Sequence, residues 1–359
     1  MANYRTSPLT EDAAGTVEHI ARWDGHTMGG RVPAFLGLAQ ATGGVYLERE
    51  GVDVQTALRE TGLDFDVRLE TVYAEREVTD IVVNDDGPAE VKRMERLEIP
   101  RYRATVGHRH DGTAFAMSPW VSPSYTPFQN TDALQWGHDI VGEAGGRLVA
   151  VGAYGNPVGC KTYAAFDLGE FQVGGKDTHD MYLTVTNAHD GSGGLAARVT
   201  PIRLACTNET SLHFGKLAPK FQMKHTRNIG GKAAAAREAL QLTLAYKDTL
   251  VEEMEGLLGQ RMTENEFIAY SRRVFGVKGS PADWKPRTAA AVQAREDVLV
   301  GLWNGDTVAD VARTRYAGFQ VIGEYADHLT TVRSEARRYE RLMEGSQDAL
   351  KQRAFAMAH

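Results

Sequence analysis

Four short segments in the middle of the chain place the strongest limit on its fold. They cover residues 147–154, 160–166, 181–186 and 195–204, and each is rich in β-branched, aromatic or small apolar residues. Polar connections separate them, as is typical of strands that follow one another through a sheet. Adjacent strands of this kind predict an antiparallel β-meander, one face of which packs on helices.

The spacing of apolar residues changes after residue 230. Residues 232–259 place Ala, Leu and Val at intervals of three and four, which predicts an amphipathic helix of about seven turns. Thr263 and Glu266 have the spacing of a capping box at the start of another helix. We therefore expect an α+β fold: a β-rich α+β domain over 1–230, then a mostly helical region over 231–359, with further helices at 287–304, 307–330 and 334–357.

The amino-terminal part also shows strand and turn signals. Residues 65–73 alternate apolar and polar side chains, as a half-buried strand does. Asp111-Gly112 lies between two strand-like segments and predicts a hairpin turn. The acidic segment 83–94 is interpreted as a loop between strands. Asp53 is expected to cap a short helix, and Asn130 or Thr131 a longer one.

Two motifs in the predicted sheet resemble a known family. They are NAHDGSGG (187–194) and TPIRLACTN (200–208), and they resemble the phage/plasmid-like proteins, a widespread mobile-element family with a domain of unknown function. Three other segments fall in the order expected for that family, whereas residues 24–30 depart from its pattern. These three segments are GLDFDVRLETVY ending at Tyr73, SPSYTPFQNTDAL (122–134) and GEYADHLTTVRS (323–334). The resemblance implies a phage or plasmid setting and favours a role in DNA metabolism.

Composition limits the class of protein. With 359 residues, of which 42% are hydrophobic, the chain can bury a large core. No apolar run approaches the roughly 18 to 20 residues that span a bilayer, so we expect no membrane partner and a cytoplasmic location in the host cell. Cys160 and Cys206 are too few for a disulfide framework and are interpreted as buried thiols.

Positive charge gathers in one segment of an otherwise acidic protein. The net charge is −7, yet residues 201–250 hold eight basic and three acidic side chains. A local basic patch can bind phosphates despite the global charge, because salt screens distant charges. The predicted nucleic-acid contacts are Arg203, Asn208, Lys216, Lys220, Lys224, Arg227 and Lys232, with base stacking by His213, Phe214 or Phe221. Two structural alternatives remain: a solvated helix face for the lysines, and a tie between strand end and helix for Arg203 and Asn208.

The preferred hypothesis is thus a single-stranded DNA binding or annealing protein that forms a homo-oligomer. This rests on the order of meander and basic helix, which is similar to that of phage annealing proteins in architecture alone. The competing hypothesis is an enzyme that acts on a small or nucleotide-like ligand between His189, Asp190, Arg203 and Asn208, with His189 and Asp190 as its catalytic candidates. A non-catalytic accessory protein is the third possibility.

Motifs for common cofactors are missing from the sequence. There is no Walker-type phosphate loop, no Gly-x-Ser-x-Gly elbow and no His-Glu-x-x-His pair, so we expect no cofactor and consider catalysis the less favoured hypothesis. His108 and His110 flank the predicted hairpin turn and are interpreted as polar turn residues rather than metal ligands. Gly191–Gly194 would either cradle a phosphate with backbone amides or form a flexible turn.

Overall fold

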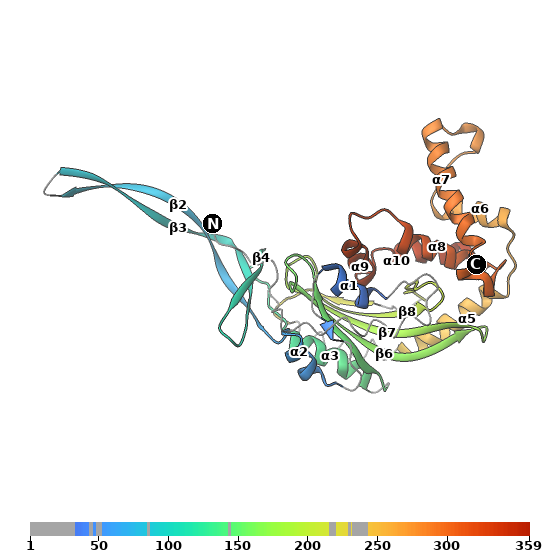
Figure 1. Ribbon diagram of the computed structural model, residues 1–359, viewed down its shortest axis with the longest axis horizontal. Coiled ribbons are helices and arrows are strands. Elements are labelled where there is room, and N and C mark those ends of the chain that lie inside the picture. The colour runs from blue at the N-terminus through green and yellow to red at the C-terminus, as the bar shows by residue number, and fades with distance from the viewer. Residues whose placement is uncertain are drawn as a thin grey trace.

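The computed structural model describes residues 33–42, 46–47, 52–84, 87–142, 145–214, 220–228, 231 and 243–359. The fold is α+β, as expected: two antiparallel sheets, with helices around the larger sheet and a helical carboxyl-terminal part (Figure 1). The divergent segment 24–30 lies outside the described residues. Among the described helices, none combines the length and apolar character that crossing a membrane requires.

The larger sheet contains the predicted meander. Its order is β1-β5-β6-β7-β8-β9, and all of its pairings are antiparallel. The four strands predicted from the sequence are therefore confirmed as consecutive neighbours. The strands are β1 (Tyr46–Leu47), β5 (Arg147–Tyr154), β6 (Lys161–Val173), β7 (Asp177–Ala188), β8 (Leu195–Arg203) and β9 (Lys220–Met223).

Helices cover both faces of this sheet. Leu183 and Val185 of β7 point to the face that packs on α2 (Val54–Glu60), α3 (Asn130–Gly142) and α5 (Thr243–Leu258). Tyr182, one position away, points to the opposite face, where α1 (Ala34–Thr42) and α9 (Glu335–Met343) pack on it. Both faces are therefore needed for the core, and side chains of β5 to β8 are divided between two clusters.

The carboxyl-terminal helices share a core with the sheet. Val199 of β8, Phe319 of α8 and Phe355 of α10 belong to one hydrophobic cluster, so residues on both sides of the expected boundary at 230/231 pack together. The capping box is confirmed, because Thr263 and Glu266 bond reciprocally at the start of α6. These elements are α6 (Glu264–Val274), α7 (Pro286–Trp303), α8 (Arg315–Glu324) and α10 (Asp348–Ala358), with short helical turns η3 (Pro281–Asp283), η4 (Asp306–Val311) and η5 (Tyr325–Leu329).

The smaller sheet has the order β2-β3-β4 and contains an unusually long hairpin. Its strands are β2 (Asp66–Asn84), β3 (Gly87–His108) and β4 (Ala114–Val121). The predicted turn at Asp111-Gly112 is confirmed between β3 and β4, with Gly112 at a φ of +83°. The predicted loop at 83–94 is wrong, because β2 continues to Asn84 and β3 already begins at Gly87. The charged side chains of this segment form ion pairs with the opposite strand, so a polar sequence that resembles a loop forms a β-strand here.

The distal part of this hairpin projects away from the body of the protein (Figure 1). We call it the arm and define it as residues 73–84 and 87–98, which pair in register from Tyr73 opposite Glu98 to Asn84 opposite Gly87. A bulge between Thr71 and Tyr73 separates it from the base of the hairpin. With a strand rise of about 3.4 Å per residue, the arm is about 40 Å long.

Candidate functional site

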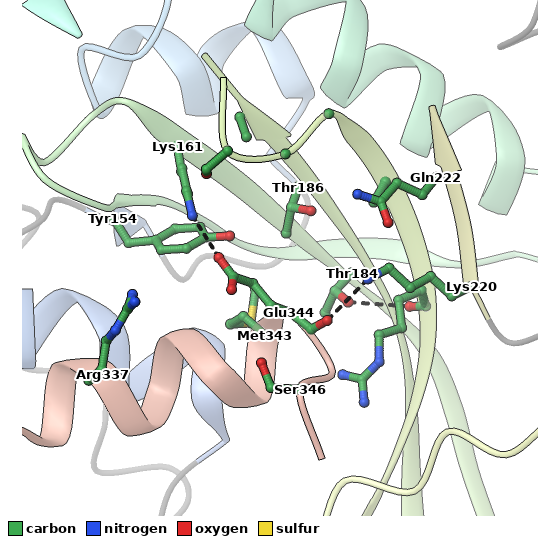
Figure 2. A pocket seen from close by; sticks show the side chains of 16 residues that line it. Tyr154, Lys161, Thr184, Thr186, Lys220, Gln222, Arg337, Met343, Glu344 and Ser346 are labelled. Atoms are coloured by element: carbon green, nitrogen blue, oxygen red, sulfur yellow. Dashed lines mark hydrogen bonds and ion pairs between the residues drawn. The ribbon is translucent and has the colours of Figure 1, made fainter. Parts of the chain in front are cut away.

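A cavity of about 360 Å³ lies on the face of the large sheet that α1 and α9 cover (Figure 2). The strands β5 to β9 provide its floor, and the connection between α9 and α10 provides a wall. Polar and charged side chains dominate the lining, so we call it the polar pocket. The residues that line it are Tyr154, Lys161, Thr184, Thr186, Ala188, Ser192, Gly193, Gly194, Ala196, Arg198, Lys220, Gln222, Arg337, Met343, Glu344 and Ser346.

The register of the sheet assembles the pocket. Thr184 lies opposite Arg198, and Arg198 lies opposite Lys220, so three neighbouring strands place three polar side chains in one row. The next row joins Thr186, Ala196 and Gln222 in the same way. Because side chains alternate between faces, these polar positions lie among apolar ones that point into the opposite core.

Lys161 and Glu344 form an ion pair in the lining of the pocket. The Lys161 Nζ lies 2.7 Å from the Glu344 carboxylate (Figure 2). It also lies 3.8 Å from the Asp190 carboxylate. Burial alone would lower the pKa of Lys161, but the hydrogen bond and the charge of Glu344 outweigh it and raise the pKa. The ammonium group also lies 5.6 Å from the centre of the Tyr154 ring. Lys161 therefore stays charged, with its charge directed into the pocket.

Arg198 belongs to a buried charge network at the other end of the pocket. Its guanidinium lies 2.9 Å from Glu209 and 2.8 Å from Asp348 and donates to the Leu342 carbonyl. Lys351 continues the network through its ion pair with Asp327 at 2.9 Å. The Nε of Arg198 is buried and has no hydrogen-bond partner among the described residues. The network fixes Arg198 in place and leaves one of its donors unused.

Lys220 has a different environment from the other three basic residues of the pocket. Its Nζ donates to the backbone carbonyl of Glu344 at 3.1 Å, and within the described part of the chain no carboxylate forms an ion pair with it (Figure 2). Burial, followed by the nearby charge of Arg198, lowers the pKa of Lys220. Arg337 pairs with Glu340. An anion in the pocket would thus meet its least compensated positive charge at Lys220.

The glycine-rich motif 187–194 forms the edge of the pocket. Asp190 accepts bonds from the backbone and hydroxyl of Ser192, at 3.0 and 2.7 Å, which fixes the turn. A Cβ on Gly194 would lie 1.8 Å from the Met223 carbonyl, so only glycine fits between β8 and the end of β9. Ser192, Gly193 and Gly194 line the pocket, which is the position that a phosphate-cradling loop would need.

The structure separates the four residues of the predicted enzyme pocket. His189 and Asp190 follow the end of β7 that pairs with Leu195, whereas Arg203 pairs with His179 at the opposite end of both strands. His189 is fully buried, and burial, with a smaller contribution from His225, lowers its pKa to about 3. It lies 2.9 Å from Asn130 inside the core. His189, Asp190, Arg203 and Asn208 therefore do not form one pocket, and His189 is not placed to act as a base on a ligand.

Arg203 and Asn208 lie in the core. Both Asp177 oxygens lie 2.9 Å from the Arg203 Nε, and Asp177 also accepts a bond from Tyr316 of α8. Asn208 donates to the Gln320 carbonyl of the same helix at 3.0 Å. Their side chains are 1% and 0% exposed, so neither reaches a phosphate in this structure. The structural alternative is the one that this geometry supports: the motif 200–208 joins β8 to the carboxyl-terminal helices.

The remaining predicted contacts are divided among three locations. Lys220 lines the polar pocket, and Lys224 follows with its Cα beside Gly194. Lys224 and Arg227 are exposed. Lys216 and Lys232 lie outside the described residues.

Two of the three predicted stacking residues pack against the core instead. Phe214 contacts Tyr246 and Phe355, and Phe221 contacts Trp136 on the sheet face opposite the pocket. Both rings are half-buried against the core, so the structure gives no support to base stacking by Phe214 and Phe221. His213 is exposed, and its backbone is bonded to Gln352.

Sequence reasoning missed several pocket residues, mainly Lys161, Arg198 and the two threonines. A signal was present: Thr184 and Thr186 alternate with Leu183 and Val185, and Arg198 lies between the apolar residues Ala197 and Val199. Among the described residues, no group of three or more His, Cys, Asp or Glu side chains is arranged to hold a metal ion. His108 pairs with Glu70 and His110 with Asp64, at 2.9 and 3.2 Å. Both cysteines are free and buried, and burial raises the pKa of Cys160 to about 12.

Comparison with known proteins identifies one family. A family model, described as the domain of unknown function DUF932, matches residues 119–343. The matched segment contains the large sheet from β5 onward and most of the pocket, but it begins after the arm. No curated protein and no solved structure matches the chain.

Proposed function

Because the chain belongs to the DUF932 family, whose description assigns no activity, we propose a function from the geometry of the polar pocket: binding of single-stranded DNA through its backbone phosphates. The observation that carries the proposal is the convergence of four basic side chains, two threonine hydroxyls and a glycine-rich loop on one cavity of about 360 Å³. Phosphate oxygens accept several hydrogen bonds at once, and such donors are their usual partners.

Lys220 is the centre of this proposal. Its charge is half-buried beside Arg198 and lacks an ion pair with the described carboxylates, so a bound phosphate would compensate it. Lys224 and Arg227 continue the positive charge along the exposed segment after β9. A strand with one phosphate at Lys220 could thus place its neighbouring phosphates near these two residues.

The size of the pocket favours a single strand over a duplex. A cavity of about 360 Å³ accepts one nucleotide unit, whereas a duplex, whose major groove alone is about 12 Å wide, does not enter it. The volume also lies in the range of about 300–1,000 Å³ found for small-ligand sites. This supports a second candidate: a free nucleotide or similar phosphorylated molecule in the same pocket.

The setting that we propose for this activity is a phage or plasmid in the cytoplasm of its host, with annealing of complementary strands as the process served. The motifs 187–194 and 200–208 support the mobile-element setting by their resemblance to the phage/plasmid-like proteins. The two buried free thiols are compatible with a reducing compartment.

The test uses two variants with opposite expected effects. Binding of a fluorescent oligothymidylate is measured by anisotropy over a series of salt concentrations. Lys220→Glu should weaken binding at least about tenfold and reduce the salt slope by about 0.7 for each phosphate that the variant no longer neutralises. Glu344→Gln should strengthen binding, because it removes the carboxylate that competes for Lys161. Lys285→Glu, at an exposed site that begins α7, is the control for the change in net charge and should leave the slope unchanged.

The same assay separates the two candidates. If affinity grows with oligonucleotide length and mononucleotides compete poorly, a strand is the ligand. Competition by a mononucleotide at its own affinity would favour the small ligand. Binding that is equal in the wild type, Lys220→Glu and Glu344→Gln would refute both proposals for this pocket.

A further inference from the structure

The arm exposes apolar side chains that the body of the protein would bury. Seven of the twelve large apolar side chains that are exposed among the described residues lie on it, including Ile81 at 72% and Val83 at 77%. They occupy both faces, because Ile81 and Val83 alternate with Val82 along β2. A ribbon of two strands without a packed face is only marginally stable in water. The arm therefore needs a partner.

Both long edges of the arm also have unpaired backbone groups. In the described structure, β2 pairs with β3 alone, and β4 pairs with β3 only between Arg103 and His108. The edges at 73–84 and 87–98 are thus open to another strand. Proteins usually protect open edges of this length, because such edges add strands from other chains.

The charges of the arm indicate which partner fits. Within the arm, residues 73–84 of β2 carry three acidic side chains and one basic one, whereas residues 87–98 of β3 carry three of each sign. Within the hairpin these charges already pair across the strands. The pairs are Arg76–Glu95, Lys92–Glu77, Arg93–Asp80 and Arg96–Glu75.

We propose that the partner is a second copy of this chain, with the β3 edge of one arm paired to the β2 edge of the next. If the arms point the same way, this pairing is antiparallel and repeats the register found inside the hairpin. Each basic side chain of β3 then gains a second acidic neighbour, as Arg96 would between two copies of Glu75. Pairing of two β2 edges would instead bring together rows of like charge, which is unfavourable.

This contact is heterologous, because it joins two different edges. A heterologous contact repeats from copy to copy and produces a ring or a filament rather than a closed dimer. Nucleic acid fits the arm less well than a second copy does, because exposed apolar side chains and open strand edges suit another strand rather than a phosphate backbone. The proposal is independent of the ligand in the polar pocket.

The first experiment measures the mass of the full-length protein by light scattering and sedimentation over a range of concentrations. The wild type should form assemblies larger than a dimer. The double variant Ile81→Lys with Val83→Lys should raise the concentration at half-assembly by at least about tenfold. Val298→Lys is the matched control, because Val298 is also an exposed valine, at 41%, but lies on α7. A monomeric wild type, or equal assembly by the arm variant, would overturn the proposal.

The second experiment tests which edges meet. Thr79→Cys places a thiol on β2 and Lys92→Cys places one on β3, and these two positions face each other in the register. The native cysteines are buried, so mild oxidation should link only the introduced thiols. A mixture of the two variants, distinguished by a size tag, should yield mainly the mixed disulfide. Preferential linking of like variants would refute the heterologous pairing.

Discussion

The large sheet and the arm are both antiparallel, yet the side chains of the sheet are mostly buried and those of the arm are mostly exposed. Residues of β8 are buried along the whole strand, and helices cover both faces of the sheet. Arm residues are mostly exposed, and their ion pairs lie in water. The contrast shows that β-sheet hydrogen bonding alone does not define a stable unit: the large sheet is stabilised by the core around it, and the arm, we infer, by another copy.

Acid should affect the body far more than the arm. Burial lowers the pKa of His189 to about 3, and of His179 and His225 to about 4, from 6.5. As the pH falls, the unfolded chain binds protons at these histidines before the folded protein does. Their contribution to the free energy of unfolding is therefore fully present above pH 6.5 and is lost as the pH drops toward 4 and 3. Each histidine contributes about 1.4 kcal/mol per pKa unit. Urea unfolding between pH 7 and 4 measures this loss of stability. His225→Gln should make the free energy of unfolding depend less steeply on pH. A flat profile would contradict the burial of these rings.

Breaking a buried ion pair should cost more than breaking an exposed one. Arg203→Ala leaves the Asp177 carboxylate buried without its partner, which should lower the free energy of unfolding by about 3–5 kcal/mol. Lys92→Ala removes an arm ion pair whose side chains are 65% and 57% exposed, and its effect should stay below about 1 kcal/mol. Chemical denaturation of both variants gives the comparison. Equal losses would mean that the arm is more firmly packed than its exposure indicates.

Apolar truncations should show the same difference. Leu183→Ala removes methyl groups from the face that packs on α3 and should cost about 2–5 kcal/mol. Ile81→Ala on the arm should change the stability of dilute protein by no more than about 0.5 kcal/mol. Thermal and urea unfolding at low concentration, where assembly does not contribute, test this pair. A large loss for Ile81→Ala under those conditions would place the side chain inside the folded monomer.

A smaller loss than those of the core variants Arg203→Ala and Leu183→Ala is expected at the close approach beside the polar pocket. Gly194→Ala places a methyl group against the Met223 carbonyl, so β9 must shift, at a cost of about 1–3 kcal/mol. Because β9 carries Lys220, the variant should also weaken oligonucleotide binding. Gly256→Ala on α5, where a Cβ meets no neighbour within 4 Å, should instead stabilise by about 0.5–1 kcal/mol. Unchanged oligonucleotide binding by Gly194→Ala would show that this glycine is not needed to position Lys220 in the pocket.

The meander and most helices follow from the sequence because their signals are local. Alternation in 181–186 and the capping box at Thr263 each depend on residues within a few positions. The arm was missed, since the charges near Asp85 resemble those of a loop until their partners across the hairpin are known. The sequence left Arg203 open between a nucleic-acid contact and a tie from strand end to helix, because its buried partner, Asp177, lies 26 residues earlier. Only the register of the sheet brings Lys161, Arg198 and Lys220 to one pocket.

The last described helix has a consequence for how the chain reaches this fold. Lys351 of α10 is buried, bonds to Asp327 and donates to the backbone of Glu209, while Phe355 packs on Phe319. During synthesis, therefore, the core that packs on the sheet is complete only after residues 348–358 have been made. Until then the carboxylate of Asp327 lacks the cation of Lys351, so an unfinished chain is expected to stay loosely organised and open to chaperones and proteases.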